Sequence, residues 1–173
     1  STPRLRRSNA SVDKLDTGDK LLILKFGAHT QIVVCEELTS AVSDLLAREN
    51  CEKVVMIVDQ NITSNSRVKE LIASLKAKCQ FELQAIVAQE PTTGIVSEVT
   101  GNLKGEGYDM LIGVGGGSTL DLAKAVSVMA VNPGEVTDYH GTGKEIRHGI
   151  RKIMIPTTAG TGSEVTPGAV LVN

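Results

Sequence analysis

The chain has 173 residues, of which 41% are hydrophobic and 22% charged, and its formal net charge is −2. This composition is ordinary for a globular protein, and the length is typical of one domain with a real core. The small negative charge argues against nucleic acid or an anionic membrane as a partner, and two Tyr, two Phe and no Trp argue against base stacking.

The ends of the chain differ from its middle. Residues 1–19 are polar and mix Arg, Ser and Thr with Asp, which predicts a disordered tail followed by one domain over residues 20–173. No apolar run has the length of a membrane span and no signal-peptide core is present, so we expect a cytoplasmic protein with reduced thiols at its three Cys residues. The chain starts with Ser and stops in the apolar run 169–173, which predicts that it is part of a longer protein.

From residue 20 onward, short apolar runs alternate with segments of helical periodicity. Strands are expected over residues 21–24, 32–34, 54–58, 81–88, 108–112 and 152–155, and helices over 36–49, 66–78, 93–104 and 119–131. Continuous apolar strands separated by helices predict an α/β fold with a parallel sheet covered on both faces, as in Rossmann-like dinucleotide-binding domains. Ligands of such sheets bind outside the carboxyl ends of the strands.

Three consecutive glycines, Gly115, Gly116 and Gly117, stand between an expected strand and an expected helix; we call them the glycine turn. Bare backbone N–H groups at a helix N-terminus favour an anion such as a phosphate. The turn is neither a G-x-G-x-x-G fingerprint nor a Walker A loop. An alternative is that Ser118 and Asp121 form a capping box, which is compatible with phosphate binding.

Two further segments follow expected strands. The segment 156–164 contributes hydroxyl donors from Thr157, Thr158 and Thr161 among small residues, although a plain polar turn would have a similar composition. Asp59 ends an apolar strand, where a carboxylate can accept hydrogen bonds from an adenosine ribose and repel a 2′-phosphate. A turn or helix cap explains Asp59 equally well. Lys124, one turn after Asp121, is expected to form an ion pair on the helix surface.

Taken together, three motifs resemble the iron-containing (group III) alcohol dehydrogenase family, which is related in fold to dehydroquinate synthase and glycerol dehydrogenase. The resemblance runs from about residue 20 to the end of the chain. Its motifs are Gly115-Gly116-Gly117-Ser118-x-x-Asp121-x-Ala123-Lys124, then Asp138-Tyr139-x-Gly141, then Pro156-Thr157-Thr158-Ala159-Gly160-Thr161-Gly162-Ser163-Glu164-Val165-Thr166.

The resemblance implies an N-terminal NAD(P)-binding domain and a C-terminal helical domain that binds a divalent metal, iron or zinc, through one Asp and three His. That helical domain would follow the segment 156–166 and is absent from this chain. The backbone of the glycine turn and Ser118 would contact the pyrophosphate, and Asp121 would lie near the nicotinamide. Thr157, Thr158 and Thr161 would line the cofactor, and Asp59 would favour NAD over NADP.

The implied activity is the interconversion of an alcohol and its aldehyde or ketone by a metal-dependent, NAD-linked dehydrogenase that is a homo-oligomer when intact. This chain alone is expected to bind NAD without turnover, and it holds no residue that we assign as catalytic or as a metal ligand. One alternative is a cyclase or lyase domain like that of dehydroquinate synthase, which the segment 156–164 argues against. Another is a non-catalytic nucleotide-binding module.

Overall fold

The computed structural model describes residues 11–14, 22–25, 30–87, 90–139, 147–166 and 168–172. Its strands are β1 (Ser11–Lys14), β2 (Leu22–Lys25), β3 (Gln31–Val34), β4 (Lys53–Asp59), β5 (Gln80–Ile86), β6 (Met110–Gly115) and β7 (Arg151–Pro156). Its α-helices are α1 (Leu38–Arg48), α2 (Ser66–Lys78), α3 (Thr93–Leu103) and α4 (Gly117–Met129), and η1 (Gln60–Ile62) and η2 (Val136–Tyr139) are 3₁₀-helices. Among the described residues, no helix is both long and apolar enough to cross a bilayer.

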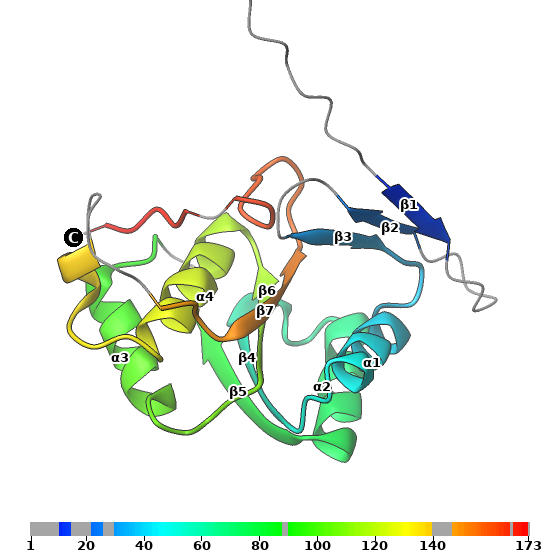
Figure 1. Cartoon of the computed structure of the whole chain (residues 1–173), viewed down its shortest axis with the longest axis horizontal. Coiled ribbons are helices and arrows are strands. Elements are labelled where there is room, and N and C mark those ends of the chain that lie inside the picture. Colours follow the sequence, from blue (N-terminus) through cyan, green and yellow to red (C-terminus); the bar gives the residue numbers. More distant parts are fainter. Residues whose placement is uncertain are drawn as a thin grey trace, which may run out of the picture.

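Four strands form a parallel sheet in the order β5-β4-β6-β7 (Figure 1). The central strand β4 is fully buried from Val54 to Val58, which is the continuous apolar run expected of a strand covered on both faces. The prediction of an α/β fold with a parallel sheet is therefore confirmed.

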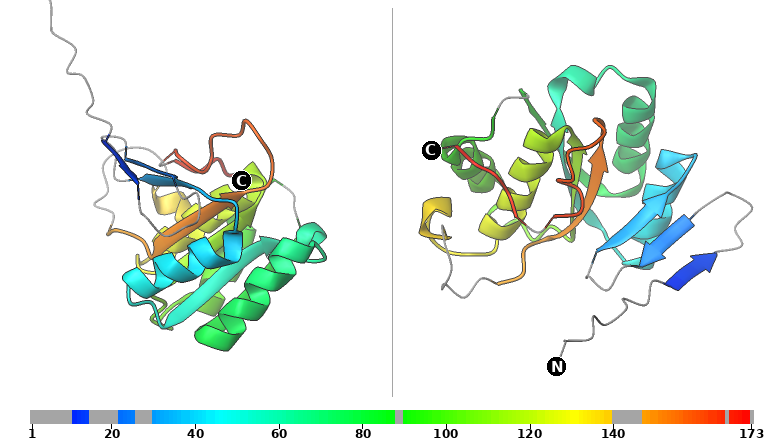
Figure 2. Two further views of the ribbon diagram at one scale, coloured as in Figure 1. Left: turned by 90° about the vertical axis from the view of Figure 1, so that its right-hand side faces the viewer. Right: turned by 90° about the horizontal axis from the view of Figure 1, so that it is seen from above.

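Helices cover the two faces of this sheet in pairs (Figures 1 and 2). Alternate residues of a strand point to opposite faces. Accordingly, Val55 and Ile57 of β4 pack in the same core cluster as α3 and α4, whereas Val54, Met56 and Val58 pack with α1 and α2. The sheet is thus the middle layer of a three-layer domain.

A second, antiparallel sheet has the order β1-β2-β3 and leads into α1. Its first strand, Ser11–Lys14, lies inside the segment 1–19 for which a disordered tail is expected, so the structure differs from that expectation at these four residues. The strand forms because Ser11–Lys14 pairs along its whole length with β2. Residues 1–10 and 15–21 lie outside the described residues.

Helix α4 begins two residues earlier than the expected helix over 119–131, because it includes Gly117 of the glycine turn as its first residue. Gly116 is the N-cap residue, and no side chain caps the helix. The alternative of a capping box formed by Ser118 and Asp121 is therefore wrong, since Ser118 already lies inside the first turn. The backbone N–H groups in the first turn of a helix have no acceptor within the helix. Because no side chain caps α4, none of these N–H groups is bound by a capping side chain.

Candidate functional site

Three segments singled out in the sequence end on one edge of the parallel sheet. Asp59 is the last residue of β4, Gly115 the last of β6 and Pro156 the last of β7. Val58 pairs with Val114, so Asp59 and Gly115 lie one step further at the same level, and Gly115 pairs with Pro156. The carboxyl edge of the sheet therefore carries Asp59, the glycine turn and the beginning of the Thr-containing segment side by side.

The segment 157–166, here called the Thr-rich loop, packs directly on the glycine turn. A Cβ on Gly116 would lie 3.4 Å from Thr158 Oγ1, and one on Gly117 would lie 3.2 Å from Ser163 Oγ and 3.4 Å from Thr161 Cβ. The tight distance gives a steric reason for glycine at 117, whereas a Cβ on Gly116 would make ordinary contact, and both show that the two motifs lie against each other. The side chain of Ser163, which the motif contains but which is not among the residues expected to line the cofactor, belongs to this contact.

Gly115 is constrained more strongly than its two neighbours. A Cβ at this position would lie 2.6 Å from Thr119 Cβ, because the first turn of α4 folds back on the end of β6. The Oγ1 atom of Thr119 is buried and has no hydrogen-bond partner among the described residues. The turn thus combines close backbone packing with the N-terminus of a helix, where the peptide dipoles attract an anion.

The Thr-rich loop is shaped by its own hydrogen bonds and glycines. Gly160 and Gly162 have φ values of 84° and 67°, a region that side chains disfavour. The Thr161 hydroxyl accepts from Ser163 N at 3.4 Å and donates to Glu164 Oε2 at 3.2 Å, so it holds the turn. Thr157 and Thr158 are exposed. Their hydroxyls therefore remain accessible at the sheet edge.

Asp59 acts as the N-cap of η1. Its Oδ1 accepts a hydrogen bond from Asn61 N at 2.9 Å, as the turn-cap alternative predicts. This bond uses one oxygen of a half-buried carboxylate, so capping does not exclude a second role for the other oxygen.

Asp121 and Lys124 form the expected ion pair, with 2.8 Å between Oδ1 and Nζ. The pair is not on the surface: the two residues are 8% and 4% exposed. Asp121 Oδ2 also accepts from Val170 N at 3.0 Å, because residues 168–172 cross over α4. We call these residues the crossing segment. Figures 1 and 2 show it passing above α4 towards the start of α3.

The described residues contain no group of three or more His, Cys, Asp or Glu side chains that could hold a metal ion. His148 is exposed, whereas His29 and His140 lie outside the described residues. All three cysteines are free thiols, and burial raises the pKa of each.

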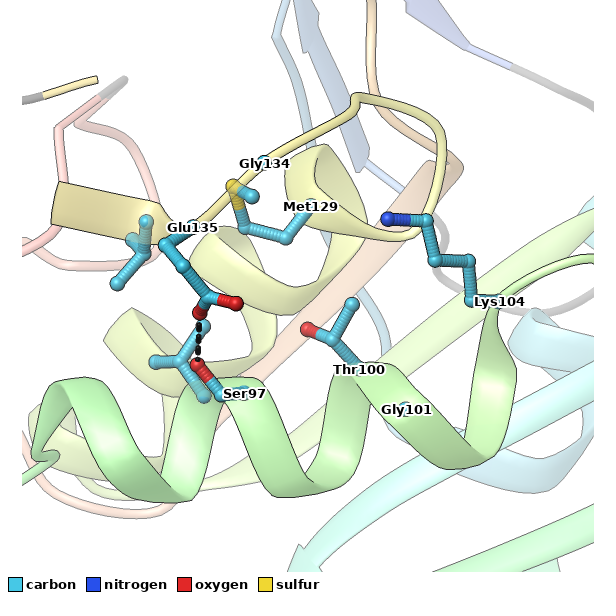
Figure 3. A pocket seen from close by; sticks show the side chains of 9 residues that line it. Ser97, Thr100, Gly101, Lys104, Met129, Gly134 and Glu135 are labelled. Atoms are coloured by element: carbon cyan, nitrogen blue, oxygen red, sulfur yellow. Dashed lines mark hydrogen bonds between the residues drawn. The ribbon is translucent and has the colours of Figure 1, made fainter. Parts of the chain in front are cut away.

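A cavity of about 210 Å³ lies away from these motifs, between α3 and the turn that follows α4 (Figure 3). Ser97 Oγ donates to Glu135 Oε2 at 2.8 Å at its margin, and the buried Thr100 Oγ1 has no partner among the described residues. None of the lining residues belongs to Asp59, the glycine turn or the Thr-rich loop, so the cavity is separate from the carboxyl edge. The lining residues are Val96, Ser97, Thr100, Gly101, Lys104, Met129, Gly134, Glu135 and Val136.

Comparison with known sequences finds relatives along most of this chain. The chain is 36% identical over 128 residues to long-chain-alcohol dehydrogenase 1 of Geobacillus thermodenitrificans, a match that covers 72% of this chain and 32% of that protein. It is 35% identical over 122 residues to sulfoacetaldehyde reductase of Bilophila wadsworthia, covering 70% of this chain and 32% of the relative. The chain therefore spans about a third of the length of these relatives.

Solved structures agree with the sequence relatives. Sulfoacetaldehyde reductase from Bifidobacterium kashiwanohense, solved in complex with NAD+, superimposes with a TM-score of 0.69 at 26% identity, over 78% of this chain and 36% of that one. An iron-containing alcohol dehydrogenase from Thermotoga maritima gives a TM-score of 0.68 at 28% identity, over 79% and 38%. The family model "Iron-containing alcohol dehydrogenase" matches residues 29–173. The chain thus belongs to the iron-containing alcohol dehydrogenase family.

Proposed function

We propose that this chain is the NAD-binding part of a metal-dependent dehydrogenase that interconverts an alcohol and its aldehyde or ketone. The observation that carries the proposal is the packing of the Thr-rich loop on the glycine turn at the carboxyl edge of the sheet. There, Gly116 and Gly117 bring uncapped backbone amides of α4 to the surface that the loop borders. Bound NAD would supply the hydride acceptor for the oxidation.

The residues present fit a dinucleotide in three respects. The N-terminus of α4 is a place for the pyrophosphate, since Gly116 and Gly117 carry no side chain that would block the backbone. Asp59 lies level with Gly115 on the next strand, where its carboxylate could accept hydrogen bonds from the adenosine ribose. The same negative charge would disfavour a 2′-phosphate on that ribose. Thr157 and Thr158 present exposed hydroxyls on the other side. A divalent metal, iron or zinc, would be held by residues outside this chain, and it would polarise the substrate oxygen when bound.

Isothermal titration calorimetry of the purified 173-residue chain with NAD+ tests the proposal. We expect saturable binding that Gly117→Val weakens at least tenfold, because the branched side chain would displace Thr161 and Ser163 from the turn. We also expect no alcohol-dependent formation of NADH when Fe²⁺ or Zn²⁺ is added. Gly101→Ala, on the exposed face of α3 with no atom within 4 Å of the new Cβ, is the matched control.

A folded chain that does not bind NAD+ would contradict the cofactor assignment. Metal-dependent turnover by the chain alone would contradict the proposal that this chain binds the cofactor while the metal is held by residues outside it. Circular dichroism of each variant separates loss of binding from loss of folding.

A further inference from the structure

We propose that the cavity between α3 and the turn after α4 binds a small zwitterion, an α-amino acid with an aliphatic side chain. The cavity is separate from the carboxyl edge, so the inference goes beyond the proposed function and does not depend on it. Three features of the lining carry it: an apolar floor, a buried hydroxyl without a partner, and opposite charges at two margins.

The size of the cavity suits a small metabolite. Its volume of about 210 Å³ equals that of about seven water molecules at about 30 Å³ each. Pockets for drug-sized ligands start at about 300 Å³, so a coenzyme would not fit. Two glycines border it: a Cβ on Gly101 would meet no atom within 4 Å, and Gly134 turns the chain with a φ of 82°. The volume matches an amino acid such as valine.

The floor of the cavity is apolar and belongs to the domain core. Val96 and Met129 are 0% and 4% exposed, and both lie in the core cluster that α3 and α4 share with one face of the sheet. Val136 of η2 packs against the same cluster and also lines the cavity. An aliphatic side chain on this floor would remove apolar surface from water on both partners.

Thr100 contributes a hydroxyl that the fold leaves without a partner. The residue is 7% exposed, and its Oγ1 forms no hydrogen bond with a described residue. Figure 3 shows this oxygen on the side of α3 that faces Met129. Buried hydroxyls are nearly always hydrogen-bonded, because an unsatisfied one is destabilising. An occupant of the cavity with a polar group would supply the missing bond.

Opposite charges stand at two margins of the cavity. Ser97 Oγ donates to Glu135 Oε2 at 2.8 Å and so holds this carboxylate in place, while Oε1 can still accept. Lys104 lines the cavity from the end of α3, and its ammonium group forms no hydrogen bond or ion pair with a described residue. Figure 3 shows Lys104 and Glu135 on opposite sides of Thr100.

This arrangement of charges selects the class of ligand. A carboxylate would bind Lys104 and an ammonium group would bind Glu135, in each case through charge-assisted hydrogen bonds. A simple acid would leave Glu135 without a partner, and a simple amine would leave Lys104 without one. A zwitterion supplies both groups in one molecule, and an aliphatic side chain completes the match to the floor.

Titration of the ¹⁵N-labelled 173-residue chain with L-valine, followed by amide chemical shifts, tests the inference. Isovalerate lacks the ammonium group of valine and isobutylamine lacks its carboxylate, so the two are matched probes. We expect valine to saturate with a dissociation constant of about 1 mM and each analogue to bind at least tenfold more weakly. The shifts should lie in residues 96–104 and 129–136, and residues 115–119 should not change.

Substitutions test the two charges separately. Lys104→Met should weaken valine binding about tenfold and leave the affinity for isobutylamine unchanged, since that amine has no carboxylate. Glu135→Gln should weaken valine binding about tenfold and leave the affinity for isovalerate unchanged. Thr100→Val keeps the shape of the side chain, and we expect a loss of about threefold. Lys76→Met and Glu70→Gln, at exposed positions of α2, are the matched controls.

Three results would overturn the inference. The first is the absence of saturable shifts at about fifty times the expected dissociation constant, which would indicate a cavity that holds water only. The second is a set of shifts centred on residues 115–119, which would place the carboxylate of valine at the glycine turn. The third is wild-type affinity for valine in folded Lys104→Met or folded Glu135→Gln. Circular dichroism establishes folding, and the two charge variants decide the question if Thr100→Val does not fold.

Discussion

At the scale of single residues, the glycine turn depends on steric limits that differ from one glycine to the next. A Cβ on Gly115 would overlap Thr119 at 2.6 Å, whereas one on Gly116 would reach only ordinary contact with Thr158 at 3.4 Å. The triple glycine thus combines one position closed by Thr119 of α4, one with room for a Cβ, and one, Gly117, where Ser163 of the Thr-rich loop would crowd a Cβ at 3.2 Å.

Gly115→Ala should destabilise the protein by about 1–3 kcal/mol, as expected for a methyl group forced into a packed site. Gly101→Ala lies in a helix with open space around it and should stabilise the protein by up to about 1 kcal/mol. Urea unfolding followed by circular dichroism measures both changes. Equal stability of Gly115→Ala and wild type would show that the end of β6 can move away from Thr119.

Asp59 offers a test of coenzyme choice that leaves its structural role in place. In Asp59→Asn the remaining amide oxygen can still accept from Asn61 N, but the negative charge is gone. We expect the ratio of NADP+ to NAD+ affinity to rise about tenfold, because a 2′-phosphate would no longer face a carboxylate. Titration of both coenzymes measures this ratio, with Asp44→Asn as the control. An unchanged ratio would place the adenosine ribose away from Asp59.

At the scale of elements, Asp109 ties the starts of β4 and β6 together at the edge opposite the candidate site. Its Oδ2 accepts from Lys53 N at 2.8 Å and from Glu52 N at 2.9 Å. These backbone hydrogen bonds hold the pKa of the Asp109 carboxyl below its ordinary value. The ionised form is thus the one that the fold stabilises.

Asp109→Asn should therefore lower the free energy of unfolding at neutral pH. A depressed pKa contributes stability that is present above the pKa of the unfolded chain, about 3.9, and is lost as the pH falls through the lower folded value. The gap between wild type and Asp109→Asn should accordingly be constant from pH 7 to about pH 5 and close at more acid pH. Urea titrations across this range measure the gap. A gap that persists in acid would indicate a loss of packing instead of charge.

Elements with strong periodicity could be predicted well, and contacts between distant segments could not. The apolar run Val54–Val58 and the helix Ser66–Lys78 follow directly from their patterns. By contrast, nothing in the spacing of Asp121 and Lys124 shows that the crossing segment buries them, since an i,i+3 pair of charges is usually solvated. The early start of α4 does not follow from the sequence for a similar reason: glycine is a poor helix former, and its place there is decided by the packing of neighbours.

The candidate site shows the same division. The carboxyl ends of parallel strands meet at one edge of a sheet. Once the strands are assigned, this rule alone predicts the shared edge of Asp59, Gly115 and Pro156. The positions of Ser163 and Thr161, where they would crowd a Cβ on Gly117, depend on the path of the loop, in which Gly160 and Gly162 have positive φ values. Local composition marks such a loop as polar and flexible but does not say where it will lie.

At the scale of the whole molecule, the carboxyl edge is assembled from segments far apart in the chain. Asp59 and Gly115 are the last residues of the central strands β4 and β6, which both core clusters share. The Thr-rich loop follows the edge strand β7 and is fastened to α4 by the buried ion pair. The site therefore joins a rigid centre to a peripheral segment, an arrangement common where loops on a scaffold carry binding residues.

The hydrogen bonds between Val172 and residues 91–93 join two segments that the ribosome makes at different times. A nascent chain that has emerged as far as residue 139 already holds β4 to β6 and all four α-helices, but it lacks the strand and loop that border the glycine turn. The coenzyme cannot act as a template at that stage, because half of its proposed binding surface has yet to be translated. Its stabilising effect by mass action would begin only when residues 157–172 have docked, so bound ligand would favour that step of folding and none of the earlier ones.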